Sequence, residues 1–146
     1  MHWDNPIPVV AAVVRWNSQF VIARNAKWPP GMFSMITGFV ERNENPMATL
    51  RRELKEELGL DLAGAEFIGH FVFPEANQLI VAFLAHGVGS VSFGSELAEV
   101  KMLTNEEAET YNFGMLGLTS TIFRKATSMV AKVDGEAIAE GEMTHQ

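Results

Sequence analysis

The chain has 146 residues, a formal net charge of −7 and no cysteine, and 47% of its residues are hydrophobic. This length fits one domain, and the lack of cysteine excludes disulfides, thiolate nucleophiles and cysteine-ligated metal centres. The acidic balance argues against a broad surface for nucleic-acid polymers, which needs basic patches, although a metal ion can offset the charge of a small phosphorylated ligand. Because no apolar run approaches the roughly 20 residues that span a bilayer, and the N-terminus lacks an export signal, we expect a cytoplasmic protein without a membrane partner.

The first part of the chain predicts a β-hairpin followed by a third short strand. The run that ends at Trp16 is rich in valine and alanine, which is typical of a buried strand. Asn17 and Ser18 form a turn signal, so the next apolar run is expected to fold back on the first. A loop with two prolines and a glycine separates this hairpin from the third run, which ends at Gly38. The predicted strands cover residues 8–16, 19–24 and 32–37.

The clearest helix lies between Asn45 and Gly59. Asn45 is a favourable N-cap and Pro46 suits the first turn, while Gly59 suits the position that ends a helix. Apolar residues recur at steps of three and four along this segment and predict one buried stripe. The stripe consists of Met47, Leu50, Leu54 and Leu58.

The rest of the chain predicts further strands and two helices. Thr104 and Glu107 form a capping box for a short helix, and apolar spacing predicts a longer helix over residues 117–129. From Val133 onward the sequence is acidic and aperiodic, so we expect one domain over residues 1–132 and a flexible tail over 133–146. This order predicts an α/β fold, with a mixed sheet and helices on its faces. The remaining strands are expected at 67–73, 78–86 and 99–103, with a loop at 87–95.

Three glutamates gather in the second half of the central helix. Glu53, Glu56 and Glu57 lie within one turn, where the helix dipole disfavours negative charge and each like-charge pair costs about 0.2–0.5 kcal/mol. A divalent cation would reverse the sign of this energy, and carboxylates are the hard oxygen ligands that Mg²⁺ or Mn²⁺ prefers. The helix taken alone favours the alternative, a solvated amphipathic face on which Arg52 pairs with Glu56.

The residues around these glutamates follow a longer pattern. In chain order, the pattern consists of Gly38, five residues, Glu44, seven residues, Arg52-Glu53-Leu54, one residue, Glu56-Glu57, one residue and Gly59-Leu60. This pattern resembles the signature of the Nudix hydrolases, the MutT-like family, at every defined position. Many members carry glycine before the first glutamate, where this chain has Asn43. Asparagine tolerates a positive φ, so we expect the turn to be kept.

The resemblance implies an α/β/α sandwich around a central mixed β-sheet, and Mg²⁺- or Mn²⁺-dependent cleavage of a pyrophosphate linkage in a nucleotide-type substrate. A homodimer is common in the family. The resemblance implies metal ligation by Glu56 and Glu57, by the Gly38 carbonyl, and by Glu53 as a further ligand or as the base that activates water. It implies that Arg52 orients the glutamates and that Glu44 supports the loop and helix.

The substrate is less closely defined. Gly38 to Glu41, Phe73-Pro74 and residues 79–83 are similar to the NADH pyrophosphatase branch, but residues 68–72 depart from it and the chain lacks that branch's cysteine zinc segment. We therefore expect a nucleoside diphosphate derivative such as NADH, ADP-ribose, or a similar dinucleotide or sugar nucleotide. The alternatives are a nucleoside triphosphate pyrophosphohydrolase that removes damaged nucleotides and a nucleotide-sensing module without catalysis.

Candidate substrate contacts lie outside this pattern. Trp28 and Phe73 are candidates to stack on a base, although an aromatic residue in a strand usually belongs to the core. Arg24 is a candidate phosphate contact or a solvated strand-end residue. Glu96 and Glu99 are candidates for an additional catalytic carboxylate, or are surface residues after a glycine-rich loop.

Overall fold

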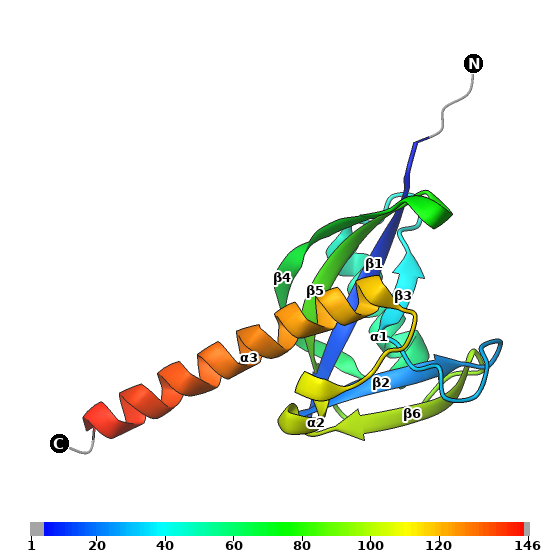
Figure 1. The fold of residues 1–146 in the computed structure, drawn as a ribbon. Helices are drawn as coiled ribbons and strands as arrows, with labels where there is room; N and C mark the ends of the chain where they lie inside the picture. The colour runs from blue at the N-terminus through cyan, green and yellow to red at the C-terminus, as the bar shows by residue number, and fades with distance from the viewer. Residues whose placement is uncertain (1–4, 145–146) are drawn as a thin grey trace.

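The computed structural model describes the backbone of residues 5–144 and the side chains of residues 5–132. In this part of the chain, one six-stranded sheet has the order β4-β5-β1-β2-β6, and β3 pairs with β1 (Figure 1). The strands are β1 (Ile7–Trp16), β2 (Gln19–Asn25), β3 (Ile36–Phe39), β4 (Asp61–Phe73), β5 (Gln78–Val88) and β6 (Leu97–Leu103). The helices are α1 (Pro46–Leu58), the short 3-10 helix η1 (Pro74–Ala76), α2 (Asn105–Thr110) and α3 (Gly117–Thr144).

Strand β1 is the centre of the sheet and makes it mixed. It runs parallel to β5 and antiparallel to both β2 and β3. The β1–β2 turn has positive φ at Asn17 (52°) and Ser18 (61°), which is the twist that suits a two-residue hairpin. The predicted hairpin and the predicted mixed sheet are therefore confirmed.

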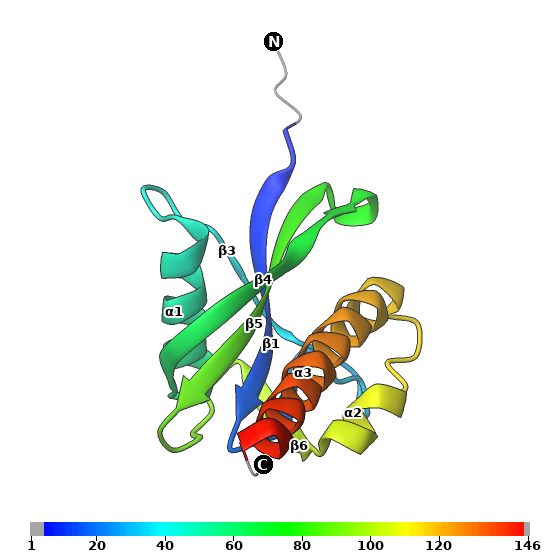
Figure 2. The same cartoon turned by 90° about the vertical axis from the view of Figure 1, so that its left-hand side faces the viewer.

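The two faces of the sheet are covered by different helices, with α1 on one face and α3 on the other (Figure 2). Alternate β1 side chains divide between two cores: Val10 and Ala12 pack on the side of α1, whereas Val9 and Ala11 pack on the side of α3. This arrangement confirms the predicted α/β/α sandwich. The cores contain Leu50, Leu54 and Leu58 from α1, and Ile122, Phe123 and Ala126 from α3.

Helix α1 has the predicted ends. The Asn45 side chain accepts a hydrogen bond of 2.9 Å from the Ala48 amide, and Gly59 has the left-handed φ of 69°. One member of the predicted stripe differs, because Met47 is 39% exposed. It lies in the first turn of the helix, before the first buried residue, Thr49. The predicted capping box of α2, made by Thr104 and Glu107, is also confirmed.

The starts of three strands differ from the predictions by two residues or more. The third strand covers Ile36–Phe39 rather than 32–37, because its partner is the segment Val9–Ala12 of β1 and Ser34 makes only an isolated bridge. Strand β4 begins at Asp61 rather than at residue 67, because pairing with β5 extends it through two irregularities in register. Strand β6 begins at Leu97, opposite Asn25. In each case pairing with a distant strand, which local pattern does not encode, sets the boundary.

Helix α3 continues to Thr144, well past the predicted end at residue 129 and through most of the segment expected to be a flexible tail. The absence of apolar periodicity there fits a helix that runs beyond the sheet, as Figure 1 shows. The domain boundary and the flexibility of residues 133–146 stay predictions, and residues 1–4 and 145–146 lie outside the described part. Within the described residues, no helix combines the length and apolar character needed to cross a membrane.

Candidate active site

The second half of α1 places Glu53 directly against β3. A Cβ atom added to Gly38 would overlap the Glu53 side chain at Cγ, Cδ and Oε1. Glycine is therefore the residue that fits at position 38, since it lets the β3 backbone approach the carboxylate. The Glu53 side chain is 13% exposed. The structure thus brings together Gly38 and Glu53, two of the residues predicted to lie at a metal site.

Arg52 joins the loop, the helix and β3. Its Nε donates to Glu44 Oε2 at 2.8 Å, and its Nη1 donates to Glu53 Oε1 at 2.8 Å and to Glu56 Oε2 at 3.3 Å. Its Nη2 donates to the Phe39 carbonyl at 3.1 Å. The Arg52–Glu56 pair expected of a solvated helix face is present, but it is the longest of these contacts to carboxylates. Arg52 thus contacts Glu44, Glu53 and Glu56, and its role in orienting them stays a prediction.

Glu44 supports this arrangement from the loop before α1. It accepts hydrogen bonds from Thr49 Oγ1 at 2.6 Å and from the Glu41 amide at 3.1 Å, in addition to those from Arg52. The Arg52 hydrogen bond, followed by those from Thr49 and Glu41, lowers the pKa of Glu44 to about 2. Asn43, just before it, has a φ of 65°, so the expected turn is kept. Thr49 is fully buried, and no sequence pattern marked it, because it occupies an undefined position of the motif.

Glu53, Glu56, Glu57 and Glu96 form an acidic cluster at the end of α1, and Glu57 is its buried member. It is 8% exposed and hydrogen-bonds to Glu96. Burial, and then this hydrogen bond and the negative charge of Glu96, raise the pKa of Glu57 to about 7. Burial also raises the pKa of Glu53, against the opposing effect of Arg52. Burial and the neighbouring carboxylates thus oppose full ionisation of Glu53 and Glu57 in the absence of a bound cation.

The loop between β5 and β6 places Glu96 beside Glu57 at the end of α1. The Ser92 amide donates to the Leu58 carbonyl at 2.9 Å, and the Gly94 amide donates to the Glu57 carbonyl at 3.0 Å. A Cβ atom at Gly94 would lie 2.7 Å from the Glu56 carbonyl oxygen, so a side chain there would push the loop off the helix. These contacts fasten the loop to the end of α1. Of the two candidate carboxylates, Glu96 joins the cluster.

Glu99, in contrast, lies within β6 and forms an ion pair with Arg24 of β2. Its Oε1 accepts from Arg24 Nε at 2.8 Å. Arg24 Nη1 also donates to the Trp28 carbonyl at 2.8 Å. The structure therefore places Arg24 against Glu99 and the Trp28 backbone.

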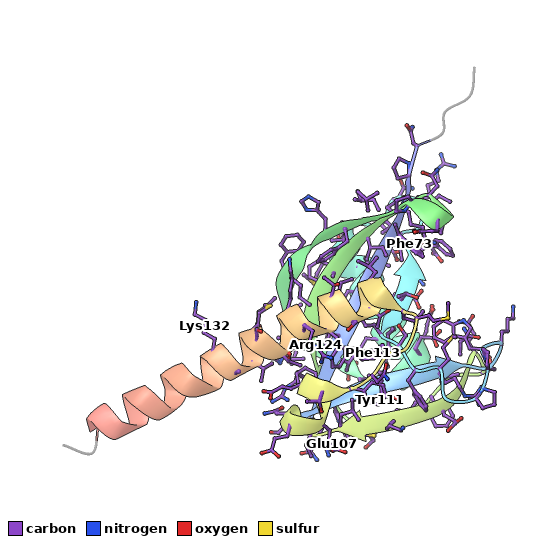
Figure 3. The ribbon with its side chains drawn as sticks, viewed as in Figure 1. Phe73, Glu107, Tyr111, Phe113, Arg124 and Lys132 are labelled. Carbon is purple, nitrogen blue, oxygen red and sulfur yellow. The ribbon has the colours of Figure 1, made fainter. Side chains whose placement is uncertain are left out.

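The two aromatic residues predicted to contact the substrate lie in different parts of the structure. Trp28 lines a pocket beside Glu57 and Glu96, together with Ala23, Asn25, Met35, Ile36, Thr37 and Leu97. Phe73 lies near the turn from β4 to β5 (Figure 3) and packs against the core on the side of α3. The structure thus brings Trp28, and not Phe73, to the carboxylates. The substrate-binding roles of both residues stay predictions.

The donor set of this cluster fits a divalent cation. The carboxylates are hard oxygen donors, and glycine at position 38 leaves its backbone open to them. Among the described side chains, no three acidic or histidine groups converge on one point. Glu53 and Glu56 instead contact the Arg52 guanidinium, at 2.8 and 3.3 Å.

Comparison with known proteins agrees with this geometry. The model of the NUDIX domain matches residues 6–120. A curated relative, the NAD-capped RNA hydrolase NudC of Mycobacterium tuberculosis strain H37Rv, is 37% identical over 90 residues, which cover 60% of this chain and 29% of the relative. NudC of Vibrio vulnificus is 29% identical over 126 residues, which cover 85% of this chain and 46% of the relative. The chain thus spans less than half the length of these curated relatives.

Solved structures share the fold. A MutT/nudix family protein from Enterococcus faecalis has a TM-score of 0.72 at 21% identity, over 90% of this chain and 64% of that one. A NUDIX hydrolase from Nitrosomonas europaea has a TM-score of 0.70 at 21% identity, over 87% of this chain and 73% of that one. Because the family model covers most of the chain, including the loop, the helix and the acidic cluster, this chain belongs to the NUDIX family.

Proposed function

We propose that this chain is a metal-dependent hydrolase that cleaves the pyrophosphate linkage of a nucleoside diphosphate derivative. One observation carries the proposal: three carboxylates gather at the end of α1. Buried Glu57 hydrogen-bonds to Glu96, and Glu53 lies beside them and is paired with Arg52. Such an arrangement is costly unless a cation binds. A divalent cation and a pyrophosphate carry the opposite charges that this site requires.

The cation would be Mg²⁺ or Mn²⁺, held by Glu56, Glu57 and the Gly38 carbonyl, with Glu53 as a further ligand or as the base that activates water. When bound, it would neutralise charge on the phosphate oxygens and lower the pKa of a water molecule. Glu96 is the candidate additional carboxylate, since it is the one in contact with Glu57.

Glu53 is the residue that we assign as general base. Water attacks one phosphorus atom, its proton passes to a Glu53 carboxylate oxygen, and the bond from that phosphorus to the bridging oxygen breaks. The bridging oxygen leaves with the other phosphate. The raised pKa of Glu53 supports this role, because a stronger base accepts the proton more readily at neutral pH. Arg52 holds the Glu53 carboxylate at 2.8 Å, and Glu44 holds Arg52.

The names of the curated relatives support a dinucleotide-like substrate. They are called NAD-capped RNA hydrolases, and an NAD cap contains a pyrophosphate linkage. We propose that this chain acts on the small-molecule counterpart, such as NADH or ADP-ribose, because a net charge of −7 disfavours contact with a nucleic-acid polymer. A cytoplasmic location and a homodimer also stay proposals.

A substrate panel tests this function. NADH, NAD, ADP-ribose, diadenosine polyphosphates, sugar nucleotides, normal and oxidised triphosphates and NAD-capped RNA are each incubated with Mg²⁺, with Mn²⁺ and with a chelator. We expect one dinucleotide or sugar nucleotide to be strongly preferred and its turnover to stop with the chelator. A triphosphate preferred over all dinucleotides would identify a nucleotide-sanitising enzyme instead. Tight binding without any turnover would identify a sensing module.

A further inference from the structure

The loop that follows β2 is fastened to the sheet by Arg24. This side chain is 14% exposed and bridges two groups, the Glu99 carboxylate of β6 and the Trp28 carbonyl of the loop, each at 2.8 Å. The Trp28 amide in turn donates to the Asn25 carbonyl at 2.9 Å. The backbone of Trp28 is thus held at both its amide and its carbonyl.

The same loop is attached to the residue that contacts Glu57. The Ala26 amide donates to the Glu96 carbonyl at 2.8 Å. The pairing of β2 with β6 changes register between Arg24 and Asn25, opposite the start of β6. Trp28 and Glu96 therefore belong to one hydrogen-bonded unit. A shift of this loop would move the indole relative to the carboxylate cluster.

The pocket between Trp28 and the carboxylates suits a neutral planar group. Among the described residues, those that line it include Glu57 and Glu96 but no lysine or arginine. Apart from the cation proposed at Glu57, this wall offers a phosphate no cationic group, whereas the indole of Trp28 is an aromatic ring system on which a base can stack. Arg24 does not line the pocket, and its guanidinium already binds a carboxylate and a carbonyl.

We propose that Trp28 determines specificity by stacking on the base of the nucleotide, and that Arg24 and Glu99 are positioning residues that hold it there. This inference rests on the proposed function, because it assumes that a nucleotide occupies the pocket. It replaces the expectation that Arg24 contacts a phosphate.

Two ligands separate these roles: AMP, and ribose 5-phosphate, which has the same sugar and phosphate but no base. Their dissociation constants are measured by calorimetry with Mg²⁺ for the unmodified chain and for Trp28→Phe, Trp28→Leu, Arg24→Gln and Glu99→Ala. Arg51→Gln, a change of an exposed arginine on α1, is the matched control. We expect Trp28→Leu to weaken AMP binding by about 5- to 150-fold, the range that corresponds to loss of one stacked base. Trp28→Phe should retain most of the affinity.

Arg24→Gln and Glu99→Ala should weaken AMP binding without changing that of ribose 5-phosphate, and Arg51→Gln should change neither. Equal weakening of both ligands by Arg24→Gln would identify a phosphate contact and overturn the proposal. So would unchanged AMP binding by Trp28→Leu, or failure of the unmodified chain to bind AMP at millimolar concentration.

A nuclear magnetic resonance spectrum checks the positioning directly. The chain has three tryptophans, and Trp28→Phe identifies the indole N–H signal of Trp28 by its disappearance. We expect this signal to move with AMP but not with ribose 5-phosphate, and to move in Arg24→Gln without ligand. Because these measurements need no turnover, stacking that persists without hydrolysis of any panel substrate would refute the proposed function alone. Hydrolysis with no shift of the Trp28 signal by AMP would refute this inference alone.

Discussion

Glu57 of α1 and Glu96 of the loop before β6 form a hydrogen-bonded pair of carboxylates, and the pKa of Glu57 is raised to about 7 as a result of burial and of this contact. Two ionised carboxylates repel each other, so such a pair retains a proton at a pH where exposed glutamates have lost theirs. Its ionisation is therefore tied to folding and to the proposed binding of a cation.

The first prediction concerns stability in the absence of metal. The folded-state pKa of Glu57 lies above the ordinary value of 4.5, so the folded chain holds an extra proton between about pH 4.5 and pH 7. The contribution of Glu57 to stability is therefore highest below pH 4.5 and falls as the pH rises toward 7. We expect Glu57→Gln to flatten this part of the profile, measured by urea denaturation at a series of pH values with a chelator present. Mg²⁺ should restore stability at pH 7, and an unchanged profile in Glu57→Gln would contradict the assignment.

The second prediction concerns the general base. Glu53→Gln keeps an oxygen that can accept from Arg52 but removes the basic carboxylate. We expect kcat to fall by about 10²- to 10⁴-fold, the usual contribution of a general base, with the melting temperature nearly unchanged. Glu75→Gln, an exposed change in η1, is the control and should retain full activity. Turnover near the original rate in Glu53→Gln would remove this residue from the chemical step.

The third prediction concerns close packing at β3. Gly38→Ala forces a methyl group into the space of the Glu53 side chain, so we expect a loss of about 1–3 kcal/mol of unfolding free energy and of most activity. Gly64→Ala is a matched control, because a Cβ atom there meets nothing within 4 Å. Both variants are compared by urea denaturation and by initial rates. Equal behaviour of the two variants would show that the approach of β3 to Glu53 is unimportant.

The fourth prediction concerns Thr49, whose hydroxyl donates to Glu44 at 2.6 Å. Thr49→Val keeps the shape of the side chain but removes the donor, and we expect it to cost about 1–3 kcal/mol, because Glu44 loses a buried partner. Thr49→Ser retains the hydroxyl and should recover most of this loss. Thermal denaturation and kcat are measured together. If serine and valine behave alike, the hydrogen bond to Glu44 contributes little.

Sequence pattern predicted the parts of the fold that local chemistry determines. The caps of α1 at Asn45 and Gly59, the positive φ at Asn43 and the β1–β2 hairpin follow from residue types at single positions. The start of β4 at Asp61 could not be predicted in this way, because residues 61–66 are strand only by pairing with β5. The same applies to the extension of α3 beyond residue 129.

In the candidate site, too, local contacts could be predicted from the sequence and contacts between distant segments could not. The motif placed Glu44, Arg52 and Glu53 together correctly, since their contacts lie within one loop and one helix. It offered no means of choosing between Glu96 and Glu99, which depends on how the loop after β5 docks on α1. Nor could it show that Arg24 forms an ion pair with Glu99, since β2 and β6, which carry these residues, are distant in sequence. Spatial contacts between distant segments supply this information.

The alternation of β1 side chains between the two cores has a further consequence for how the molecule unfolds. Val10 supports the layer that carries the acidic cluster, and Val9 supports the layer beneath α3, yet both belong to one strand. Neither layer can lose its packing without loosening the strand that the other needs. We therefore expect loss of structure in a single cooperative transition, in which damage to the α3 side also loosens the side that carries Glu53 and Glu57.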